Sequence, residues 1–551
     1  MKRIIFGLAM FFYAAAFAVD QLVISEKPEA YATMHCAGVL WNVYGDDNGN
    51  AACSVEYREN GALEWKKAMD LFRCPEVKPT QDSLAEVNTW DKNKRGYILE
   101  RWKKNYLAGS IFDLKEGKEY EIKLFLKDSD GGEAAETLLV KTRIYPKFSD
   151  SKSVSVTQVK PTSRDALKKA VSEAKAGATI LVYAGKYDGN IKIKVPLTLM
   201  AAGDGEVIVE GENKKGSEDV ERGIDFLVPD IMLYGITVSR FPYALHTVKG
   251  ADRIAIIRCT VKESHYGIVL KSSDCYISDC VLTGDNDTAL GSFDGEGIQT
   301  YGGNGHVICY NRITRFADQM SVETPNSDVF GNDCFDGSDD GMETDGGGPN
   351  IRIFKNRFYS IMHHGISFQP YSGGPAYIIR NQIAGMNENV FKDVYLSSGA
   401  VLLHNTLVNI TRTAIIRNTY SRNNLFQSSG VLKYYEKDEL NLRLNMDYDG
   451  FISKIKMTAP KMYEDIEQEV NGIAAKEENG FENRTEIPAP PKLFNPAPVF
   501  KLKEGSPFVD AGVKIANIND DFTGKAPDLG ALEQGAPEPV YGPRSINAEM
   551  K

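Results

Sequence analysis

Cysteine is scarce in this sequence, and basic residues are in the minority. The 551 residues include eight cysteines, and no Cys-x-x-Cys pair occurs among them, so a cysteine-ligated zinc site is not expected. Lysine and arginine number 64 against 75 aspartates and glutamates, which gives a net charge of −11. Because binding to a phosphate backbone requires a basic face, nucleic acid is not an expected partner.

Long apolar runs are also lacking, except near the N-terminus. After residue 18 no segment reaches the roughly 18 uninterrupted apolar residues of a membrane-spanning helix, so we expect no membrane insertion after cleavage. Lys2 and Arg3 precede an apolar run, and Ala16-Phe17-Ala18 has the small residues of a cleavage site. Residues 1–18 are therefore predicted to be a signal peptide, and the protein to be secreted, either periplasmic or extracellular.

Residues 19–147 show the alternation of a β-sandwich. Apolar and polar residues alternate in segments such as 38–43 and 120–126, and clusters of Asp, Asn and Gly separate these segments. This pattern predicts half-buried antiparallel strands in two packed sheets. With the stretch 114–125 before the last hairpin, the unit resembles a fibronectin type III module.

Within residues 148–440, which we expect to form one domain, the sequence repeats from about residue 251. A polar residue recurs between two short apolar runs, and in five coils it is an asparagine: Asn311, Asn332, Asn356, Asn381 and Asn405. The spacings are 332 − 311 = 21, 356 − 332 = 24, 381 − 356 = 25 and 405 − 381 = 24 residues. Three short strands per coil of this length are typical of a parallel β-helix. We expect the asparagines to stack as a hydrogen-bonded ladder at one turn, with Cys259 and Asp279 in the same frame upstream.

Both ends of the repeat carry segments that could cover it. A helix is predicted between residues 163 and 177, and it suits the open N-terminal end of a solenoid. Residues 441–551 are expected to close the C-terminal side, with a helical insertion at 460–476. The predicted fold is all-β: an N-terminal β-sandwich followed by a right-handed parallel β-helix with an N-terminal capping helix. We expect a monomer.

The strand before each asparagine strand places acidic residues on one outer face. Stacking the coils predicts an inward ladder of Leu245, Ile268, Ile298, Met320, Met342, Ile366 and Tyr395. Two rows then point outward: His246, Val269, Gln299, Ser321, Glu343 and Ser367, and Val248, Lys271, Tyr301, Glu323, Asp345 and Gln369. The row before the strand reads Tyr243, Tyr266, Glu296, Asp318, Asp340, His364 and Asp393. Acidic groups this close are unfavourable unless they are protonated, metal-bound or used in chemistry.

These coils resemble the polygalacturonase-type glycoside hydrolases, which are right-handed parallel β-helices. That family carries Asn-Thr-Asp, Asp-Asp, Gly-His-Gly and Arg-Ile-Lys on successive coils. This chain has Phe316-Ala317-Asp318, then Asp339-Asp340, then His363-His364-Gly365. By this resemblance Asp339 would protonate the leaving oxygen, Asp318 and Asp340 would hold and deprotonate the water, and His364 would orient the site. An inverting pair of this kind has carboxyl groups about 6.5–9.5 Å apart.

The chain also departs from the family pattern. The Asn and Thr of the first motif are missing, and the expected fourth coil reads Lys392-Asp393-Val394-Tyr395-Leu396 without the Arg-Ile-Lys motif. In the family those cations bind a uronate carboxylate, so their absence argues against galacturonan. We expect a polysaccharide to bind along the outward face, through His364, Glu343, Asp345, Gln299 and Lys271.

Two alternatives stay open beside the hydrolase, which needs no cofactor. A pectate-lyase-like enzyme would hold Ca²⁺ on Glu323, Glu343 and Asp345 and use Lys271, Arg315 or Lys392 as the base. An acidic face repels an anionic polysaccharide unless calcium intervenes, so a lyase should require the metal and a hydrolase of a neutral glycan should not. The third hypothesis is a non-catalytic surface protein that binds glycans.

Overall fold

The structure is a computed structural model. It describes residues 20–545, apart from 25, 77–80, 82–83, 86–98, 148–154, 213–220, 394–396, 435–442, 453–456, 459–468, 477–478, 483–487, 489 and 495. The predicted signal peptide at 1–18 lies outside the described residues. No helix in the described part of the chain is long and apolar enough to cross a membrane.

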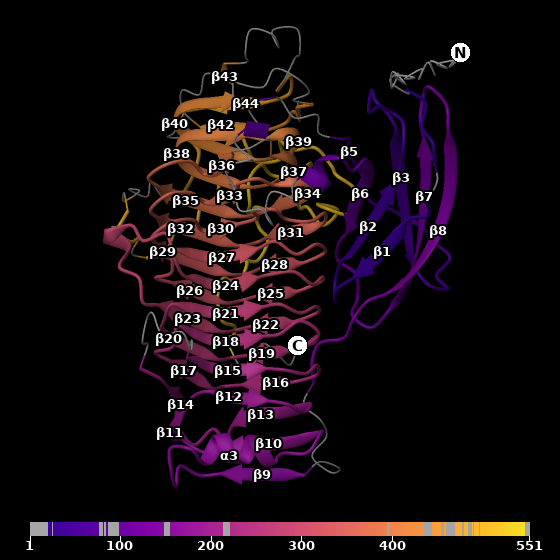
Figure 1. The fold of residues 1–551 in the computed structure, drawn as a ribbon. Coiled ribbons are helices and arrows are strands. Elements are labelled where there is room, and N and C mark those ends of the chain that lie inside the picture. Colours follow the sequence, from indigo (N-terminus) through magenta and orange to yellow (C-terminus); the bar gives the residue numbers. More distant parts are fainter. Residues whose placement is uncertain are drawn as a thin grey trace, which may run out of the picture.

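The N-terminal unit consists of two antiparallel sheets that pack against each other (Figure 1). One sheet has the order β1 (Glu29–Ala32), β2 (Ala37–Asn42), β6 (Tyr106–Ile111), β5 (Phe72–Cys74). The other has the order β4 (Lys66–Lys67), β3 (Ala52–Glu59), β7 (Glu119–Lys127), β8 (Glu133–Lys141). The alternation seen in the sequence is the cause: in β7 the burial of successive residues alternates along the strand. The predicted sandwich is present, while its assignment to the fibronectin type III modules stays a prediction.

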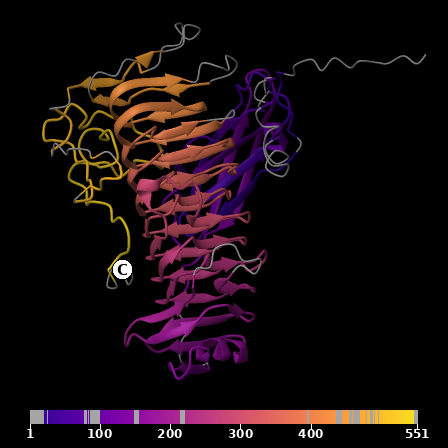
Figure 2. The ribbon, with the colours of Figure 1, turned by 60° about the vertical axis from the view of Figure 1, so that its left-hand side comes forward.

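The strands from β9 to β44, between residues 156 and 475, wind into a parallel solenoid with three sheets (Figures 1 and 2). The first, which we call the sandwich-side sheet, contains β9 (Val156–Val159), β10 (Ala178–Val182), β13 (Leu197–Ala201), β16 (Met232–Tyr234), β19 (Ala255–Ile257), β22 (Tyr276–Ser278), β25 (Val307–Cys309), β28 (Asp328–Phe330), β31 (Ile351–Phe354), β34 (Ser372–Ile379), β37 (Ser398–Leu403), β39 (Arg417–Arg422) and β41 (Asn445–Met446).

The second, the tail-side sheet, contains β11 (Gly185–Asp188), β14 (Val207–Glu210), β17 (Thr237–Ser239), β20 (Thr260–Ser264), β23 (Val281–Gly284), β26 (Arg312–Thr314), β29 (Asp333–Gly337), β32 (Arg357–Ile361), β35 (Gln382–Met386), β38 (Thr406–Ile415), β40 (Leu425–Tyr434), β42 (Gly450–Ile452) and β44 (Ile473–Ala475), with β43 (Met457–Thr458) paired to β40. The third, the front sheet, contains β12 (Ile191–Ile193), β15 (Arg222–Phe226), β18 (Tyr243–Thr247), β21 (Tyr266–Leu270), β24 (Glu296–Thr300), β27 (Asp318–Val322), β30 (Met342–Glu343), β33 (Ile366–Phe368) and β36 (Phe391–Asp393).

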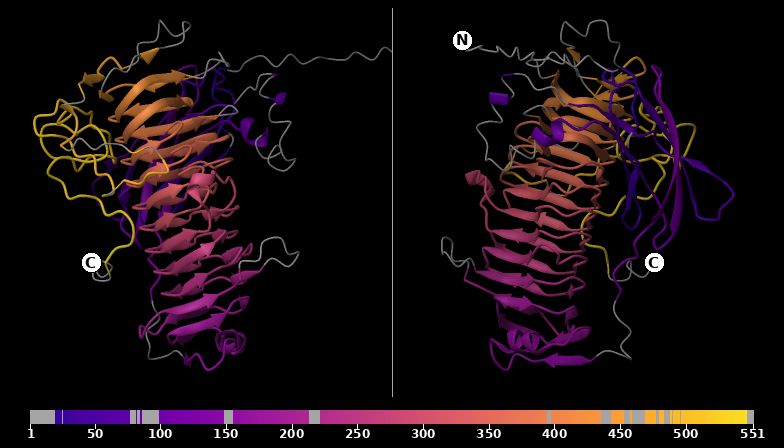
Figure 3. Two further views of the ribbon diagram at one scale, coloured as in Figure 1. Left: turned by 90° about the vertical axis from the view of Figure 1, so that its left-hand side faces the viewer. Right: turned by 45° about the vertical axis from the view of Figure 1, so that its right-hand side comes forward.

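Helix α3 (Ala166–Glu173) lies at the N-terminal end of the solenoid (Figure 3). Its buried residues Leu167 and Val171 join the solenoid core. The predicted capping helix is confirmed. The helical insertion predicted at 460–476 falls mostly outside the described residues. Of its described residues, Ile473–Ala475 form strand β44, so the predicted helix does not extend over these three.

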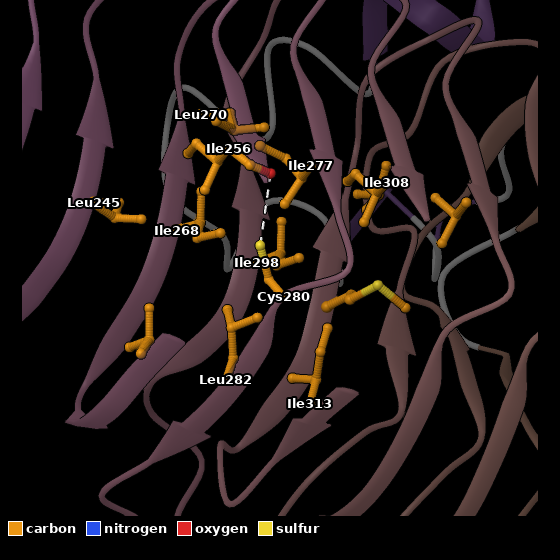
Figure 4. Packing of buried hydrophobic residues seen from close by; sticks show 14 of the residues in the cluster. Leu245, Ile256, Ile268, Leu270, Ile277, Cys280, Leu282, Ile298, Ile308 and Ile313 are labelled. Atoms are coloured by element: carbon orange, nitrogen blue, oxygen red, sulfur yellow. Dashed lines mark hydrogen bonds between the residues drawn. The ribbon is translucent and has the colours of Figure 1, made fainter. Parts of the chain in front are cut away.

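The interior of the solenoid is filled by stacked apolar ladders (Figure 4). On the front sheet the register pairs Leu245 with Ile268, Ile268 with Ile298, and so on through Met320 and Met342 to Ile366. The next partner is Phe391 and not Tyr395, which lies outside the described residues. The prediction was therefore correct for six coils and wrong for the seventh, because the coil is 391 − 366 = 25 residues long rather than 395 − 366 = 29.

The asparagine ladder is confirmed. The Nδ2 atom of each asparagine donates to the Oδ1 atom of the next, at 2.9–3.1 Å from Asn311 to Asn405. Asn424 and Asp449 extend the ladder at the C-terminal end. Upstream, the Cys280 backbone N–H donates to Asn311, so Cys280 continues the row and not Asp279. All eight cysteines are buried and unpaired.

The sandwich and the C-terminal tail pack on two of the three solenoid faces. The sandwich contacts the sandwich-side sheet, where Thr33 and Arg352 both bind the buried Asp328. The tail follows the tail-side sheet: the Phe500 N–H donates to Gln382, and Arg544 forms an ion pair with Asp279 at 2.6 Å. The acidic rows lie on the remaining front sheet.

Candidate active site

The front sheet carries an outward row that is polar except at Val269. Register pairs place in this row Asp225, His246, Val269, Gln299, Ser321, Glu343, Ser367 and Lys392. The predicted row is therefore confirmed, and Lys392 extends it by one coil. The front strand of this last coil lies earlier in the chain than predicted from the sequence. In the structure that strand is β36, which spans Phe391–Asp393 and sets Lys392 opposite Ser367. One cation does occupy this coil, and Asp393 ends the strand instead of preceding it.

Asp318, Asp339 and Asp340 converge where the tail-side strands turn into the front sheet. One carboxylate oxygen from each lies within 4.8 Å of the others. The Asp340 backbone N–H also donates to Asp318 Oδ1 at 3.0 Å. Asp339 is the most exposed of the three, at 9%, while Asp340 has no exposed surface. The selected oxygens of the three side chains thus face one another; their spacing describes single oxygens, whereas the roughly 6.5–9.5 Å of an inverting pair separates two whole carboxyl groups.

His364 and Lys392 hold Asp340 from the two following coils. Asp340 Oδ1 lies 2.8 Å from His364 Nδ1, and Asp340 Oδ2 lies 3.2 Å from Lys392 Nζ. His364 Nε2 is 3.2 Å from Glu388 Oε2, and Glu388 also pairs with His363 at 2.8 Å. The network therefore places a cation and an imidazole directly against the carboxyl cluster.

The pKa values of the two adjacent aspartates, Asp339 and Asp340, are displaced in opposite directions. Burial and the charge of Asp340 raise the pKa of Asp339 to about 6. Burial opposes ionisation of Asp340 too, but hydrogen bonds from His364 and Lys392 outweigh it and hold the pKa of Asp340 below its usual value. Environments that separate the pKa values of two neighbouring carboxyl groups are characteristic of an acid and base pair.

The pKa values of Asp318 and Glu343 are both raised, which favours their protonated forms. Burial and the charge of Glu343 raise the pKa of Asp318 well above its ordinary value. Burial and the charge of Asp345 likewise raise the pKa of Glu343. Asp318 is therefore a poor proton acceptor in this state, and Asp340 is the member of the cluster that stays ionised.

The residues expected to bind substrate lie along the same face, in different roles. Asp345 accepts hydrogen bonds from the Gln369 backbone N–H at 2.8 Å and from Ser367 Oγ, so it also caps the next strand. Gln299 Nε2 donates to Glu296 Oε1 and to the Tyr301 hydroxyl, both at 2.8 Å. Lys271 Nζ lies 5.9 Å from the centre of the Tyr301 ring.

Two sets of three acidic residues have carboxylate oxygens close enough together to hold a cation. Glu296, Asp318 and Glu343 form the first, and Asp318, Asp339 and Asp340 the second, each with one oxygen per residue within 4.8 Å. Oxygen donors of this kind suit a hard cation such as Ca²⁺. The calcium set proposed from the sequence was Glu323, Glu343 and Asp345, and the first group retains only Glu343 of these.

Glu296, Glu388 and the contact between Lys392 and Asp340 were not assigned to the site from the sequence. Glu296 was placed in the entrance row, and its position one coil before Asp318 was a usable signal. Glu388 lies in a loop between β35 and β36, where the coil periodicity gives no position.

Residues 247–431 match the model of a family described as the right handed beta helix region. Together with the parallel register, this shows a right-handed parallel β-helix. No curated protein matches the sequence significantly. Among solved structures, a PL6 family alginate lyase, AlyGC, is similar with a TM-score of 0.40 and 12% identity, over 70% of this chain and 60% of the lyase. Two mutants of the periplasmic alginate epimerase AlgG are similar with TM-scores of 0.31 and 0.30 at 12% identity, over 58% of this chain and 84% of each epimerase.

Proposed function

We propose that the protein is a secreted polysaccharide-degrading enzyme that hydrolyses a glycosidic bond at the front sheet. The observation that carries this proposal is the convergence of Asp318, Asp339 and Asp340, with His364 and Lys392 held against Asp340. A glycoside hydrolase requires one protonated and one ionised carboxyl group beside the scissile bond. Asp339 is the most exposed of the three, so it is the one that can reach a leaving oxygen.

The roles follow from these positions. Asp339 protonates the leaving group, and Asp318 and Asp340 hold the attacking water. Asp340 takes the proton, because it is ionised and Asp318 is not. His364 and Lys392 keep Asp340 ionised and in place. The polysaccharide lies along the outward rows, in contact with Glu343, Gln299 and Lys271.

A digestion panel with matched readouts tests this function. The purified chain is incubated with neutral and uronate-containing polysaccharides, with and without EDTA. We expect new reducing ends, no absorbance at 235 nm and no effect of EDTA on at least one polysaccharide. Products that absorb at 235 nm, formed only when calcium is present, would show a lyase.

A calcium-dependent lyase is the second candidate. It is favoured by Glu296, Asp318 and Glu343, whose carboxylate oxygens lie close enough together to bind one cation. Lys392 is a poor base for that reaction. Burial acts to lower its pKa, but the charges of Asp340, Asp339 and Asp345 outweigh burial and raise it. A lysine base requires a lowered pKa, so Lys271 or Arg315 would have to serve instead.

A further inference from the structure

A loop of the solenoid reaches over the edge of the candidate site. Residues 285–295 connect β23 to β24 and contain the short helix η1 (Thr288–Leu290), which projects from the solenoid at the left of Figure 1. Thr288 Oγ1 donates to Asp336 Oδ1 at 2.6 Å. Ser338 Oγ donates to the Ser292 carbonyl at 2.7 Å. The loop is thus fixed to the coil that carries Asp339, two coils beyond its own.

These contacts place an exposed aromatic ring beside the carboxyl cluster. Phe293 follows the anchored Ser292, and its side chain is 67% exposed. Its ring centre lies 5.1 Å from that of His363, with the two planes tilted by 47°. Ser292 contacts Ser338, which precedes Asp339, and Phe293 contacts His363, which precedes His364. Both contacts are therefore made to direct neighbours of site residues. A solvent-exposed phenylalanine held in this way adds little to the core.

We propose that Phe293 forms the stacking surface of a sugar-binding subsite next to Asp339. The ligand is a six-membered sugar ring, whose apolar C–H face packs on the aromatic ring while its hydroxyl groups face the acidic row. Phenylalanine has few rotatable bonds, so holding it against His363 costs little entropy and leaves it ready for the ligand. This inference rests on the proposed function, because it takes the carboxyl cluster as the place where the sugar chain lies.

Leu290 provides a matched control. It belongs to the same loop and is 81% exposed, but its side chain has no aromatic face on which a sugar ring could stack. For Phe293→Ala we expect KM to rise roughly 3- to 10-fold with kcat changed less than about twofold, because stacking binds the substrate and its transition state alike. Phe293→Trp should keep KM at or below the wild-type value, and Leu290→Ala should leave both constants unchanged. All three variants should keep the wild-type melting temperature.

Binding is measured separately from turnover, so the two proposals can fail independently. Hexasaccharides of glucan, mannan, xylan and polyuronate are titrated calorimetrically into the Asp339→Asn chain, with and without Phe293→Ala. If Phe293→Ala weakens binding while the wild-type chain cleaves nothing, the subsite stands and the hydrolase proposal fails. If Phe293→Ala and Leu290→Ala have equal effects, if Phe293→Ala has none, or if no hexasaccharide binds, the subsite is rejected.

Discussion

Asp340 and His364 are joined by two hydrogen bonds across adjacent coils. Asp340 Oδ1 lies 2.8 Å from His364 Nδ1, and it also accepts from the His364 backbone N–H at 3.1 Å. The side-chain contact holds Nδ1 against Asp340 and turns Nε2 toward Glu388. Because the backbone bond is set by the coil stacking, the solenoid register itself orients the imidazole beside the carboxyl cluster.

Lys392 should control the ionisation of Asp340. Lys392→Met removes a cation 3.2 Å from Asp340 Oδ2, so the pKa of Asp340 should rise. A proton acceptor must be ionised, and activity is therefore lost as the pH falls through its pKa. We expect the acidic limb of the kcat/KM profile to move up by about one pH unit or more. Lys392→Arg keeps the charge and should leave the limb in place; a limb that does not move in Lys392→Met would contradict the role.

The asparagine ladder should contribute to stability independently of the site. Asn356 Nδ2 donates to the Val329 carbonyl and to Asn381 Oδ1, and all three groups are buried. Asn356→Leu removes these two side-chain hydrogen bonds and also the Asn356 Oδ1 acceptor, which binds the buried Asn332 backbone N–H and Asn332 Nδ2. We therefore expect the free energy of unfolding to fall by about 1–3 kcal/mol in a denaturant titration. Asn387→Leu, at an exposed position of the next coil, is the control and should change it by less than about 0.5 kcal/mol.

The repeat made most of the solenoid predictable. Asparagines at 21- to 25-residue spacing defined the coil, and strand alternation then fixed which residues point inward, so six members of the ladder from Leu245 to Ile366 were placed correctly. The prediction for the seventh coil was wrong because its front strand, β36, begins three residues before a second strand-like run that starts at residue 394. Applying the 25-residue step from Asn356 to Asn381 would have selected Phe391 over Tyr395.

The electrostatics of the site could be predicted only in part. The sequence showed that carboxyl groups would gather on three successive coils. It did not show that Lys392 reaches Asp340, because that contact depends on the corrected register and on the direction of a long side chain. The different titration of Asp318 and Asp340 also depends on burial and partners, which have no signal in a list of acidic residues.

A buried carboxyl pair at the end of the ladder should make stability depend on pH. The Asp449 backbone N–H donates to Glu469 Oε2 at 3.1 Å. Burial and the charge of Asp449 raise the pKa of Glu469 to about 10, and burial raises that of Asp449 to about 6. A raised pKa means that the folded state binds the proton more tightly, so this stabilisation is complete below the ordinary pKa and is lost as the pH rises toward 10.

Glu469→Gln removes that dependence, because an amide needs no proton to be buried neutral. Between pH 6 and pH 9 the melting temperature of the wild-type chain should fall by at least about 2 °C more than that of the variant. Glu504→Gln at an exposed site is the control and should follow the wild-type curve. Parallel curves for the wild-type chain and Glu469→Gln would contradict a raised pKa of Glu469 in the folded state.

Asp339 should set the alkaline limit of activity. A general acid must be protonated, and the pKa of Asp339 is raised to about 6, so kcat/KM should decline as the pH rises through about 6. Asp339→Asn keeps the size of the side chain and removes the proton. Hydrolysis should then fall by about 10²–10⁴-fold, and the alkaline limb near pH 6 should disappear from the residual activity. The melting temperature should change little, because an asparagine forms similar local hydrogen bonds.

Asp345→Asn is the decisive comparison, since Asp345 lies on the same face but caps a neighbouring strand. For a hydrolase this change should reduce activity much less than Asp339→Asn does, and added calcium should make no difference. If instead Asp345→Asn alone abolishes activity, calcium restores it and the products absorb at 235 nm, the enzyme is a lyase. If neither change affects turnover of a polysaccharide that the chain cleaves, the carboxyl cluster is not where the bond is broken. If polysaccharides bind but none is cleaved, the front sheet is a recognition surface, because its acidic rows then contact the glycan without transferring a proton.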